Sequence, residues 1–383
     1  MDFNFTPEQR LLRDSVRELM KRHASPEYVR QLEQDQKFPY DLYDAWVEAG
    51  LLGLSFPEEY GGLGGTVMDV MIVTEEISKI STDLVMSYCA AIFCGLNIVR
   101  NGSEEQKRYW IPKLLDGEIM LAICMSEPDA GSDVGAMRTA AVRQGDGWLI
   151  NGQKLWTSGA GLKNTVLCVY AKTNPAVHYR EGVSFFLIDN DTPGVQCRKL
   201  EMLGRRCFGT YEVFFRDVIV PAERLVGGEN HGWQCMLSGL DVERLVGAAM
   251  NIGGAQAIVD MALEYSKERV QFGRPIGTFQ SIAHMIADMQ TEIEAGRALM
   301  WRAAAMMANN ENALKEINMA KLYTSELYAK VANQGVQIMG AYGLNAEYDM
   351  QRLFRNARSA TIEAGTSQTQ RNLIAGLMGL KCR

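Results

Sequence analysis

The chain has no excess of positive charge and few histidines. Lys and Arg number 39 against 46 Asp and Glu, which gives a formal net charge of −7 for 383 residues. Nucleic acid and anionic lipid attract basic surfaces, so the composition supports neither kind of partner. The four histidines are far apart, and no His-Glu-x-x-His segment occurs. A metal site or a histidine-based catalytic triad therefore has little support.

Paired cysteines and long apolar runs are also missing. None of the eight cysteines forms a Cys-x-x-Cys pair or a zinc-site spacing, so we interpret them as buried thiols in a reducing compartment. No uncharged apolar run approaches the ~18 residues that a membrane span requires. The N-terminal residues MDFNFT lack the basic and apolar regions of a secretory signal. We therefore expect a cytoplasmic protein without a membrane partner.

The pattern of apolar residues changes twice along the chain, which at this length indicates two or three domains. Residues 1–118 have the spacing of helices, whereas residues 119–231 contain short runs rich in Val, Phe, Ile and Tyr. Such runs, separated by Asn, Asp, Gly and Pro, are typical of strands. Helical spacing returns in residues 232–383, where 280–309 and 313–339 are long enough for a helical bundle.

Two helix starts are marked by capping boxes. Thr6 is followed by Pro7, which suits the first helical turn, and by Gln9, which can return a hydrogen bond to the cap. Ser103 and Gln106 repeat the signal. We therefore expect helices to begin directly after Thr6 and Ser103.

Two segments of the expected β-domain carry groups suited to a cofactor. Residues 124–133 (CMSEPDAGSD) offer two hydroxyls beside a Gly-containing turn, where backbone N–H groups can approach a polar ligand closely. Residues 150–159 (INGQKLWTSG) add a Trp face and a further hydroxyl. A flavin requires donors for its polar edge and N5, a flat wall against its ring, and amides near its pyrophosphate. We interpret the two segments together as a flavin cradle.

The two segments, in this order and at this interval, resemble the acyl-CoA dehydrogenase family of flavoenzymes. The resemblance covers nearly the whole chain and includes residues 60–64 (YGGLG), 269–273 (RVQFG) and 364–368 (AGTSQ). It implies an α+β fold with a helical N-terminal domain, a middle β-barrel domain and a C-terminal four-helix bundle. It also implies FAD as cofactor, an acyl-CoA substrate and electron-transfer flavoprotein as the electron partner.

The resemblance assigns flavin contacts by position. Ser126 matches a hydrogen bond to the pyrimidine side, Trp156 matches the ring cover, and Ser158 matches a contact to N5. Ser132 matches a position near the pyrophosphate and is also expected near the substrate. Thr366 and Gln368, in the segment AGTSQ, match further flavin contacts.

The resemblance also implies that a second copy of the chain completes the flavin site. Arg269, Phe272, Gln337 and Gly340 match positions from which a neighbouring subunit holds the adenine half. We therefore expect a homotetramer, the usual form of the family, or a homodimer. Arg244 matches a position that contacts the CoA arm.

The catalytic base is the point at which the chain departs from the commonest family pattern. Desaturating a thioester requires a base for the α-proton, a hydride acceptor at the β-carbon and donors on the carbonyl. In many members the base is a glutamate directly before Gly-Thr, where this chain has Ala364. The preceding Glu363 is expected to point elsewhere, because neighbouring side chains diverge in direction.

Residues 239–246 (GLDVERLV) resemble isovaleryl-CoA dehydrogenases, in which the base lies on this helix and the usual position is alanine. Glu243 is therefore the predicted base, with a pKa that burial raises. By the same resemblance, the backbone N–H of Ala364 and a flavin ribityl hydroxyl donate to the thioester carbonyl. Glu243 then takes the α-proton and flavin N5 the β-hydride.

Three functions remain open at this point. The first is FAD-dependent α,β-desaturation of an acyl-CoA, and the second is an enoyl-CoA reductase that uses the same site in reverse. The third is a flavin-containing, nucleic-acid-binding relative, which the acidic net charge opposes. The acyl cavity is expected around residues 88–96, with Met86, Met236 and Leu240. No arginine occurs between Ser81 and Val99, which disfavours a dicarboxylyl-CoA. The length and branching of the acyl chain stay undecided.

Overall fold

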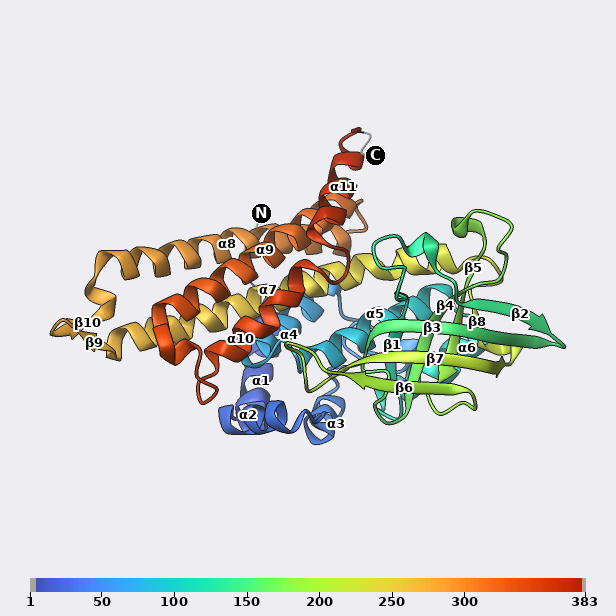
Figure 1. Cartoon of the computed structure of the whole chain (residues 1–383), viewed down its shortest axis with the longest axis horizontal. Helices are drawn as coiled ribbons and strands as arrows, with labels where there is room; N and C mark the ends of the chain where they lie inside the picture. The colour runs from blue at the N-terminus through green and yellow to red at the C-terminus, as the bar shows by residue number, and fades with distance from the viewer. Residues whose placement is uncertain (1–4, 381–383) are drawn as a thin grey trace.

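The computed structural model describes residues 5–380 and orders them as helices, then strands, then helices (Figure 1). Residues 1–4 of the N-terminal stretch and Cys382 lie outside the described part. The first helical part consists of α1 (Pro7–His23), α2 (Pro26–Asp35), α3 (Tyr40–Glu48), α4 (Val67–Ile80), α5 (Val85–Asn101) and α6 (Glu104–Leu115). Short 3-10 helices are η1 (Glu58–Tyr60), η2 (Val134–Ala136), η3 (Tyr179–Glu181), η4 (Ala222–Arg224), η5 (Ile276–Thr278), η6 (Gly340–Gly343) and η7 (Arg358–Thr361).

Both predicted capping boxes are confirmed. The Thr6 hydroxyl accepts from the Gln9 backbone N–H, and the Gln9 side chain accepts from the Thr6 N–H, each at 3.2 Å. Ser103 and Gln106 exchange the same pair of bonds at 3.2 and 2.9 Å. Satisfying the first N–H groups of a helix in this way sets where it begins. The Gln106 amide also donates to the Leu225 carbonyl, so this cap ties α6 to the β-domain.

The middle part is one eight-stranded sheet with the order β6-β7-β3-β2-β4-β5-β8, and β1 pairs with β4 beside this path. Its strands are β1 (Met120–Cys124), β2 (Ala140–Gln144), β3 (Gly147–Ser158), β4 (Thr165–Lys172), β5 (Val183–Asp189), β6 (Val195–Leu200), β7 (Thr210–Val220) and β8 (Leu225–Val226). The end strands β6 and β8 do not pair with each other, so the predicted barrel is an open one.

The sheet is buried on two sides, and its strands alternate accordingly. Leu167 and Val169 of β4 pack in a core enclosed by the sheet, together with Phe186 of β5. The alternate residues Cys168 and Tyr170 belong to the core shared with the helices. Because side chains of a strand point alternately to its two faces, this period of two docks β4 against the helices. The strand β1, which leads into the first cradle segment, likewise packs against α5, and β5 packs against α7.

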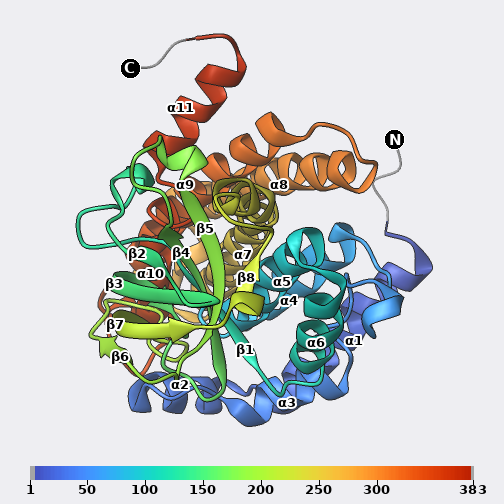
Figure 2. The ribbon, with the colours of Figure 1, turned by 90° about the vertical axis from the view of Figure 1, so that its right-hand side faces the viewer.

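The C-terminal part is helical, as predicted. It contains α7 (Gly232–Glu268), the hairpin strands β9 (Val270–Gln271) and β10 (Arg274–Pro275), α8 (Gln280–Ala308), α9 (Leu314–Met339), α10 (Met350–Ala357) and α11 (Ser367–Leu377). The long helices α7, α8 and α9 run side by side, the β9–β10 hairpin lies at their far end, and α11 projects from the body (Figures 1 and 2).

Helix α7 is the central element of the molecule. In the described part of the chain it alone is long and apolar enough to cross a bilayer, yet 72% of its most apolar window is buried inside the protein. It therefore has the character of a core helix, and it extends from the sheet to the β9–β10 hairpin (Figure 1).

The cysteines are nearly all buried. Six of the seven that the structure describes are inaccessible, but Cys197 on β6 is only half-buried. The prediction of buried thiols is therefore wrong for Cys197, because β6 is an edge strand with one face toward solvent.

Candidate active site

The two predicted cradle segments are joined by a buried ion pair. Lys154 of β3 is fully buried, and its Nζ lies 2.8 Å from a carboxylate oxygen of Glu127 in the loop after β1. Glu127 also accepts from the backbone N–H groups of Arg138 and Thr139, at 2.5 and 3.0 Å. Lys154 donates in addition to the Met125 carbonyl at 3.0 Å. These bonds hold both ends of the loop that carries the predicted serines.

Trp156 stands on an irregular part of β3. The register between β3 and β7 shifts between Lys154 and Thr157, and Trp156 has a left-handed backbone with φ of +65°. Such a conformation costs free energy for a side chain of this size and is found mostly where function requires it. The bulge leaves the Trp156 side chain 56% exposed, which provides a large flat surface without a neighbour covering it.

The predicted hydroxyl residues lie on the same two chain segments as this surface, and Ser126 bonds directly to the strand that carries Trp156. The Ser126 carbonyl accepts from the N–H of Leu155, next to Trp156, at 2.9 Å. Ser158 ends β3 opposite Thr210 and is half-buried, whereas Ser132 is exposed in its turn. Beside Ser132, a Cβ built at Gly131 would meet no atom within 4 Å. An exposed aromatic wall, half-buried hydroxyls and an open glycine turn fit the requirements of a flavin.

Four predicted flavin contacts lie far from this cradle. Arg269 directly precedes the β9–β10 hairpin and Phe272 lies in its turn, whereas Gln337 and Gly340 lie at the end of α9. Figure 1 shows this hairpin at the opposite end of α7 from the sheet. Phe272 is 95% exposed and has a φ of +50°. A single chain therefore does not bring these residues to its own cradle, and their predicted role requires a second chain.

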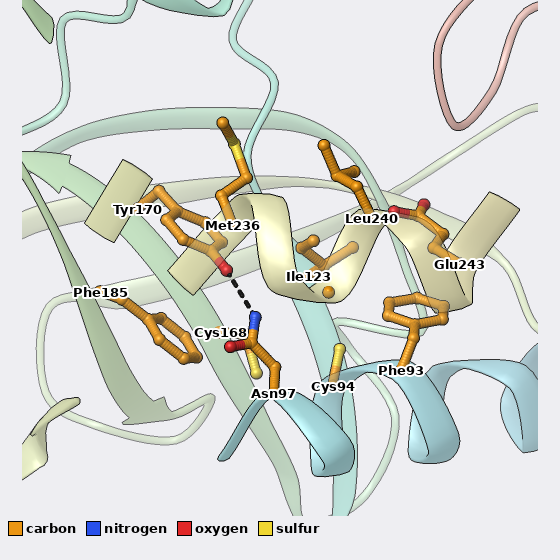
Figure 3. A pocket seen from close by; sticks show the side chains of 11 residues that line it. Phe93, Cys94, Asn97, Ile123, Cys168, Tyr170, Phe185, Met236, Leu240 and Glu243 are labelled. Atoms are coloured by element: carbon orange, nitrogen blue, oxygen red, sulfur yellow. Dashed lines mark hydrogen bonds between the residues drawn. The ribbon is translucent and has the colours of Figure 1, made fainter. Parts of the chain in front are cut away.

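Glu243 lies on α7 at the edge of a small cavity between α5, α7 and the sheet (Figure 3). The cavity measures about 10 Å³, which is the space of a single water molecule. Its wall includes Leu240 and Glu243 of α7 and the pair Asn97 and Tyr170, joined by a 3.0 Å hydrogen bond. The cavity gives Glu243 an apolar surrounding with few hydrogen-bond partners.

The environment of Glu243 suits a general base. Burial raises the pKa of its carboxyl to about 7, with the charge of Arg244 opposing and that of Glu363 adding to the effect. A base is most effective when its pKa lies near the working pH. The predicted direction of this shift is therefore present in the structure, and burial is its main cause.

Ala364 occupies a strained turn that two buried side chains hold. Its φ is +51°, and its carbonyl accepts from the Gln370 amide at 3.0 Å. Lys321 of α9 donates to the carbonyls of Gly365 and Ala360, at 2.6 and 3.2 Å. Within residues 5–380 the Ala364 N–H has no acceptor. The turn thus presents a free donor, as a carbonyl-binding position requires.

Sequence reasoning missed Lys321 and Gln370. Lys321 lies on the same α9 face as the buried Ile317 and Tyr328, four residues after the first and seven before the second. A lysine within an apolar stripe is a signal that could have identified it. Burial lowers the pKa of Lys321 to about 8, although the charge of Glu363 opposes this.

The remaining predicted residues have local structural partners. Thr366 caps α11 by accepting from the Thr369 N–H at 3.1 Å, and Gln368 is exposed on the first turn. Arg244 is buried, and its guanidinium lies 3.7 Å from the Asp241 carboxylate. Glu363 forms an ion pair with Arg205 at 2.5 Å.

Three buried acidic groups lie at the junction of the N-terminal helices and the sheet. Potential ligand atoms of Glu33, Asp83 and Cys207 are within 4.8 Å of one another. Asp83, however, accepts from the backbone N–H groups of Cys207 and Phe208 at 2.7 and 3.2 Å. Glu33 lies 2.6 Å from Arg355. Asp83 and Glu33 therefore have structural partners, and the cluster connects the N-terminal helices to the loop before β7 and to α10.

Three family models match successive parts of the chain. The model "Acyl-CoA dehydrogenase, N-terminal domain" matches residues 6–118. The corresponding middle-domain model matches residues 122–218, and the C-terminal-domain model matches residues 230–378.

Individual proteins match over the whole chain. A "Probable acyl-CoA dehydrogenase YngJ" of Bacillus subtilis is 37% identical over 98% of this chain and 99% of its own length. The "Caffeyl-CoA reductase-Etf complex subunit CarC" of Acetobacterium woodii is also 37% identical, with the same coverage. The solved butyryl-CoA dehydrogenase of Megasphaera elsdenii superimposes with a TM-score of 0.95 at 31% identity, covering 99% of this chain and 100% of that one.

Proposed function

The chain belongs to the acyl-CoA dehydrogenase family, and from that premise we propose that it desaturates an acyl-CoA thioester between the α- and β-carbons. It is an oxidoreductase with FAD as its cofactor. The observation that carries the proposal is the position of Glu243, half-buried on α7 at the edge of the apolar cavity, where burial raises the pKa of its carboxyl to about 7. The free N–H at Ala364 supplies the donor that the carbonyl of the same substrate would require.

Separate residues of the site accept the proton, stabilise the developing charge and position the donor. Glu243 accepts the α-proton, and the Ala364 N–H stabilises the negative charge that develops on the thioester oxygen. Bound FAD supplies the acceptor for the hydride that leaves the β-carbon. Lys321 and Gln370 hold the Ala364 turn in its left-handed conformation and so position the donor. The product is a 2-enoyl-CoA.

The electron partner and the direction of the reaction belong to the same proposal. We infer that electrons pass to an electron-transfer flavoprotein, in keeping with the relative that is named as part of a reductase–Etf complex. That relative also favours a second candidate function, reduction of an enoyl-CoA through the same residues. Proton transfer at Glu243 is reversible, so the site geometry serves both directions, and the redox potentials of flavin and partner decide between them.

An anaerobic titration tests the function. We expect the oxidised flavin band of the purified protein to bleach when the correct saturated CoA thioester is added, because Glu243 and FAD together remove both hydrogens. A panel of saturated and 2-enoyl esters of varied length and branching should be followed by absorbance. If only chemically reduced flavin reacts, and does so with an enoyl-CoA, the reductase function replaces the dehydrogenase. Absence of flavin after reconstitution would contradict both.

We further propose that the chain acts as a homo-oligomer. The exposed Phe272 and a groove of about 580 Å³ between α7, the hairpin and α8 offer a surface at the bundle end. Light scattering after gel filtration should give at least twice the chain mass of 42.7 kDa. We expect Phe272→Asp to weaken flavin retention, with Phe272→Tyr as the matched control. A monomer with full flavin occupancy would contradict the proposal.

A further inference from the structure

The face of α7 that carries Glu243 is open at one position. Met236, Glu243 and Met250 are spaced by seven residues and therefore lie on the same side of the helix, about two turns apart. Met236 and Met250 are buried, but at Gly247, between Glu243 and Met250, a built Cβ would meet no atom within 4 Å. A group bound beside Glu243 thus has room over Gly247.

Arg205 bounds this space at the level of Met250. It comes from the loop between β6 and β7, and its guanidinium lies 3.8 Å from the Met250 sulfur and 2.8 Å from the sulfur of Met86 on α5. Its Nη2 donates to the Glu363 carboxylate at 2.5 Å, one residue before Ala364. The ion pair of Arg205 and Glu363 therefore lies beside Met250, the next residue of this α7 face after Gly247, and adjoins Ala364 in sequence.

The guanidinium of Arg205 is short of acceptors. It carries five N–H donors, and thioether sulfurs such as those of Met86 and Met250 accept only weakly. The Arg205 side chain is 9% exposed, and its Nε has no partner in the described part of the chain. Glu363 is the single strong acceptor in contact with it. A buried cation with an unfilled donor is costly, so Arg205 has a donor that a bound acceptor could satisfy.

The backbone at Arg205 is strained in the same way as the predicted site residues. Its φ is +57°, and its N–H donates to the Asn356 side chain at 2.8 Å. Trp156, Phe272 and Ala364 share the left-handed conformation. Asparagine and aspartate adopt this conformation readily, but an arginine does so only when its surroundings compel it. The structure therefore holds this guanidinium in place at a local cost.

Three cations and three carboxylates surround this region. Lys321 feels the charges of Glu363, Arg244, Glu243 and Arg205, and Arg244 also lies 3.7 Å from the Asp241 carboxylate. Arg205 has Glu363 as its ion-pair partner, and its buried Nε has no acceptor in the described part of the chain. An oxygen atom of a bound group could accept a hydrogen bond from that Nε.

We propose that Arg205, oriented by Glu363, determines acyl specificity by binding an oxygen function on the acyl group beyond its β-carbon. The site would prefer acyl-CoA substrates with a distal carboxylate or hydroxyl over plain hydrocarbon chains. The inference rests on the proposed function, since it names the substrate class of that site. It also revises the expectation drawn from residues 81–99, because the arginine near α5 comes from the β-domain instead.

Matched CoA esters of equal chain length that end in a methyl, a hydroxyl or a carboxylate test the inference. In the wild type we expect kcat/KM for at least one oxygenated ester to exceed that of the methyl ester by ~10-fold or more, the scale of a buried hydrogen bond to a charged group. The double variant Arg205→Met/Glu363→Leu should abolish this ratio. Changing both residues avoids leaving one buried charge unpaired.

The control is the exposed pair Arg143–Glu229, whose double variant Arg143→Met/Glu229→Leu should keep the wild-type ratio. Arg205→Lys should keep part of the preference, because it retains the positive charge. A wild type that favours the methyl ester, with a ratio that the double variant leaves unchanged, overturns the specificity inference while the proposed function stands. If no ester of any kind reduces the flavin, the proposed function itself fails.

Discussion

Glu243→Gln is expected to lower the rate of flavin reduction by an acyl-CoA at least ~100-fold, the scale of a missing general base. Glutamine has nearly the same shape as glutamate but cannot accept the α-proton. The neighbouring charges of Arg244 and Glu363 remain in place. Stopped-flow absorbance under anaerobic conditions measures the rate, and the flavin spectrum verifies that the variant still holds its cofactor.

The pH dependence distinguishes a lost base from a disturbed structure. Burial raises the pKa of Glu243 to about 7, so the fraction able to accept a proton grows as the pH rises through that value. Wild-type reduction should therefore accelerate across this range, and the residual rate of Glu243→Gln should lose the dependence. Near-normal reduction by the variant would sink the assignment of the base. In a Glu243→Gly background, Ala364→Glu should restore part of the rate from the other side of the substrate.

Lys154→Met is expected to lower the free energy of unfolding by about 3–5 kcal/mol, because it leaves the buried Glu127 carboxylate without its cation. Burial alone would raise the pKa of Glu127, but the charge and hydrogen bonds of Lys154 and the N–H donors of the loop hold it below its usual value. That stabilisation is present above the unfolded pKa and is lost as the pH falls through the folded one. Because the Lys154–Glu127 pair holds the loop that carries the predicted flavin contacts Ser126 and Ser132, the variant should also release flavin more easily.

Chemical denaturation and flavin retention measure these effects. The matched control is Glu127→Gln in the Lys154→Met background, which removes the unpaired charge. It keeps a carbonyl acceptor for one of the two backbone N–H groups, because Arg138 and Thr139 donate to different oxygens of Glu127. This double variant should regain part of the lost stability. A loss below about 1 kcal/mol in the single variant, within the range of an exposed ion pair, would show that the pair does not hold the loop.

Local sequence patterns predicted the features of the fold that depend on residues close together in the sequence. The capping residues at Thr6 and Ser103 act within one helical turn, so their sequence alone identifies them. The base was predicted from the family resemblance, in which alanine at the position of Ala364 accompanies a glutamate at the position of Glu243, and it stays a prediction. The helical stretches were visible because apolar periodicity records burial directly.

The hydrogen bonds of Lys321 to the Ala364 turn, and the ion pair of Arg205 with Glu363, depend on contacts between residues that are distant in sequence. Lys321 reaches Gly365 across 44 positions, and Arg205 reaches Glu363 across 158. The left-handed backbone at Arg205 has no local signal either, because arginine does not favour it. Such features arise only when three parts of the chain are packed together, and single-sequence patterns do not record that packing.

The meeting of Met86, Arg205 and Glu363 has a consequence for the order of folding. These residues come from α5, the loop between β6 and β7 and the segment before α11, so no single domain holds all three. Domains of a long chain generally fold in order as they leave the ribosome. The three side chains can therefore meet only after the segment with Ala364 has docked onto the helices and the sheet made before it.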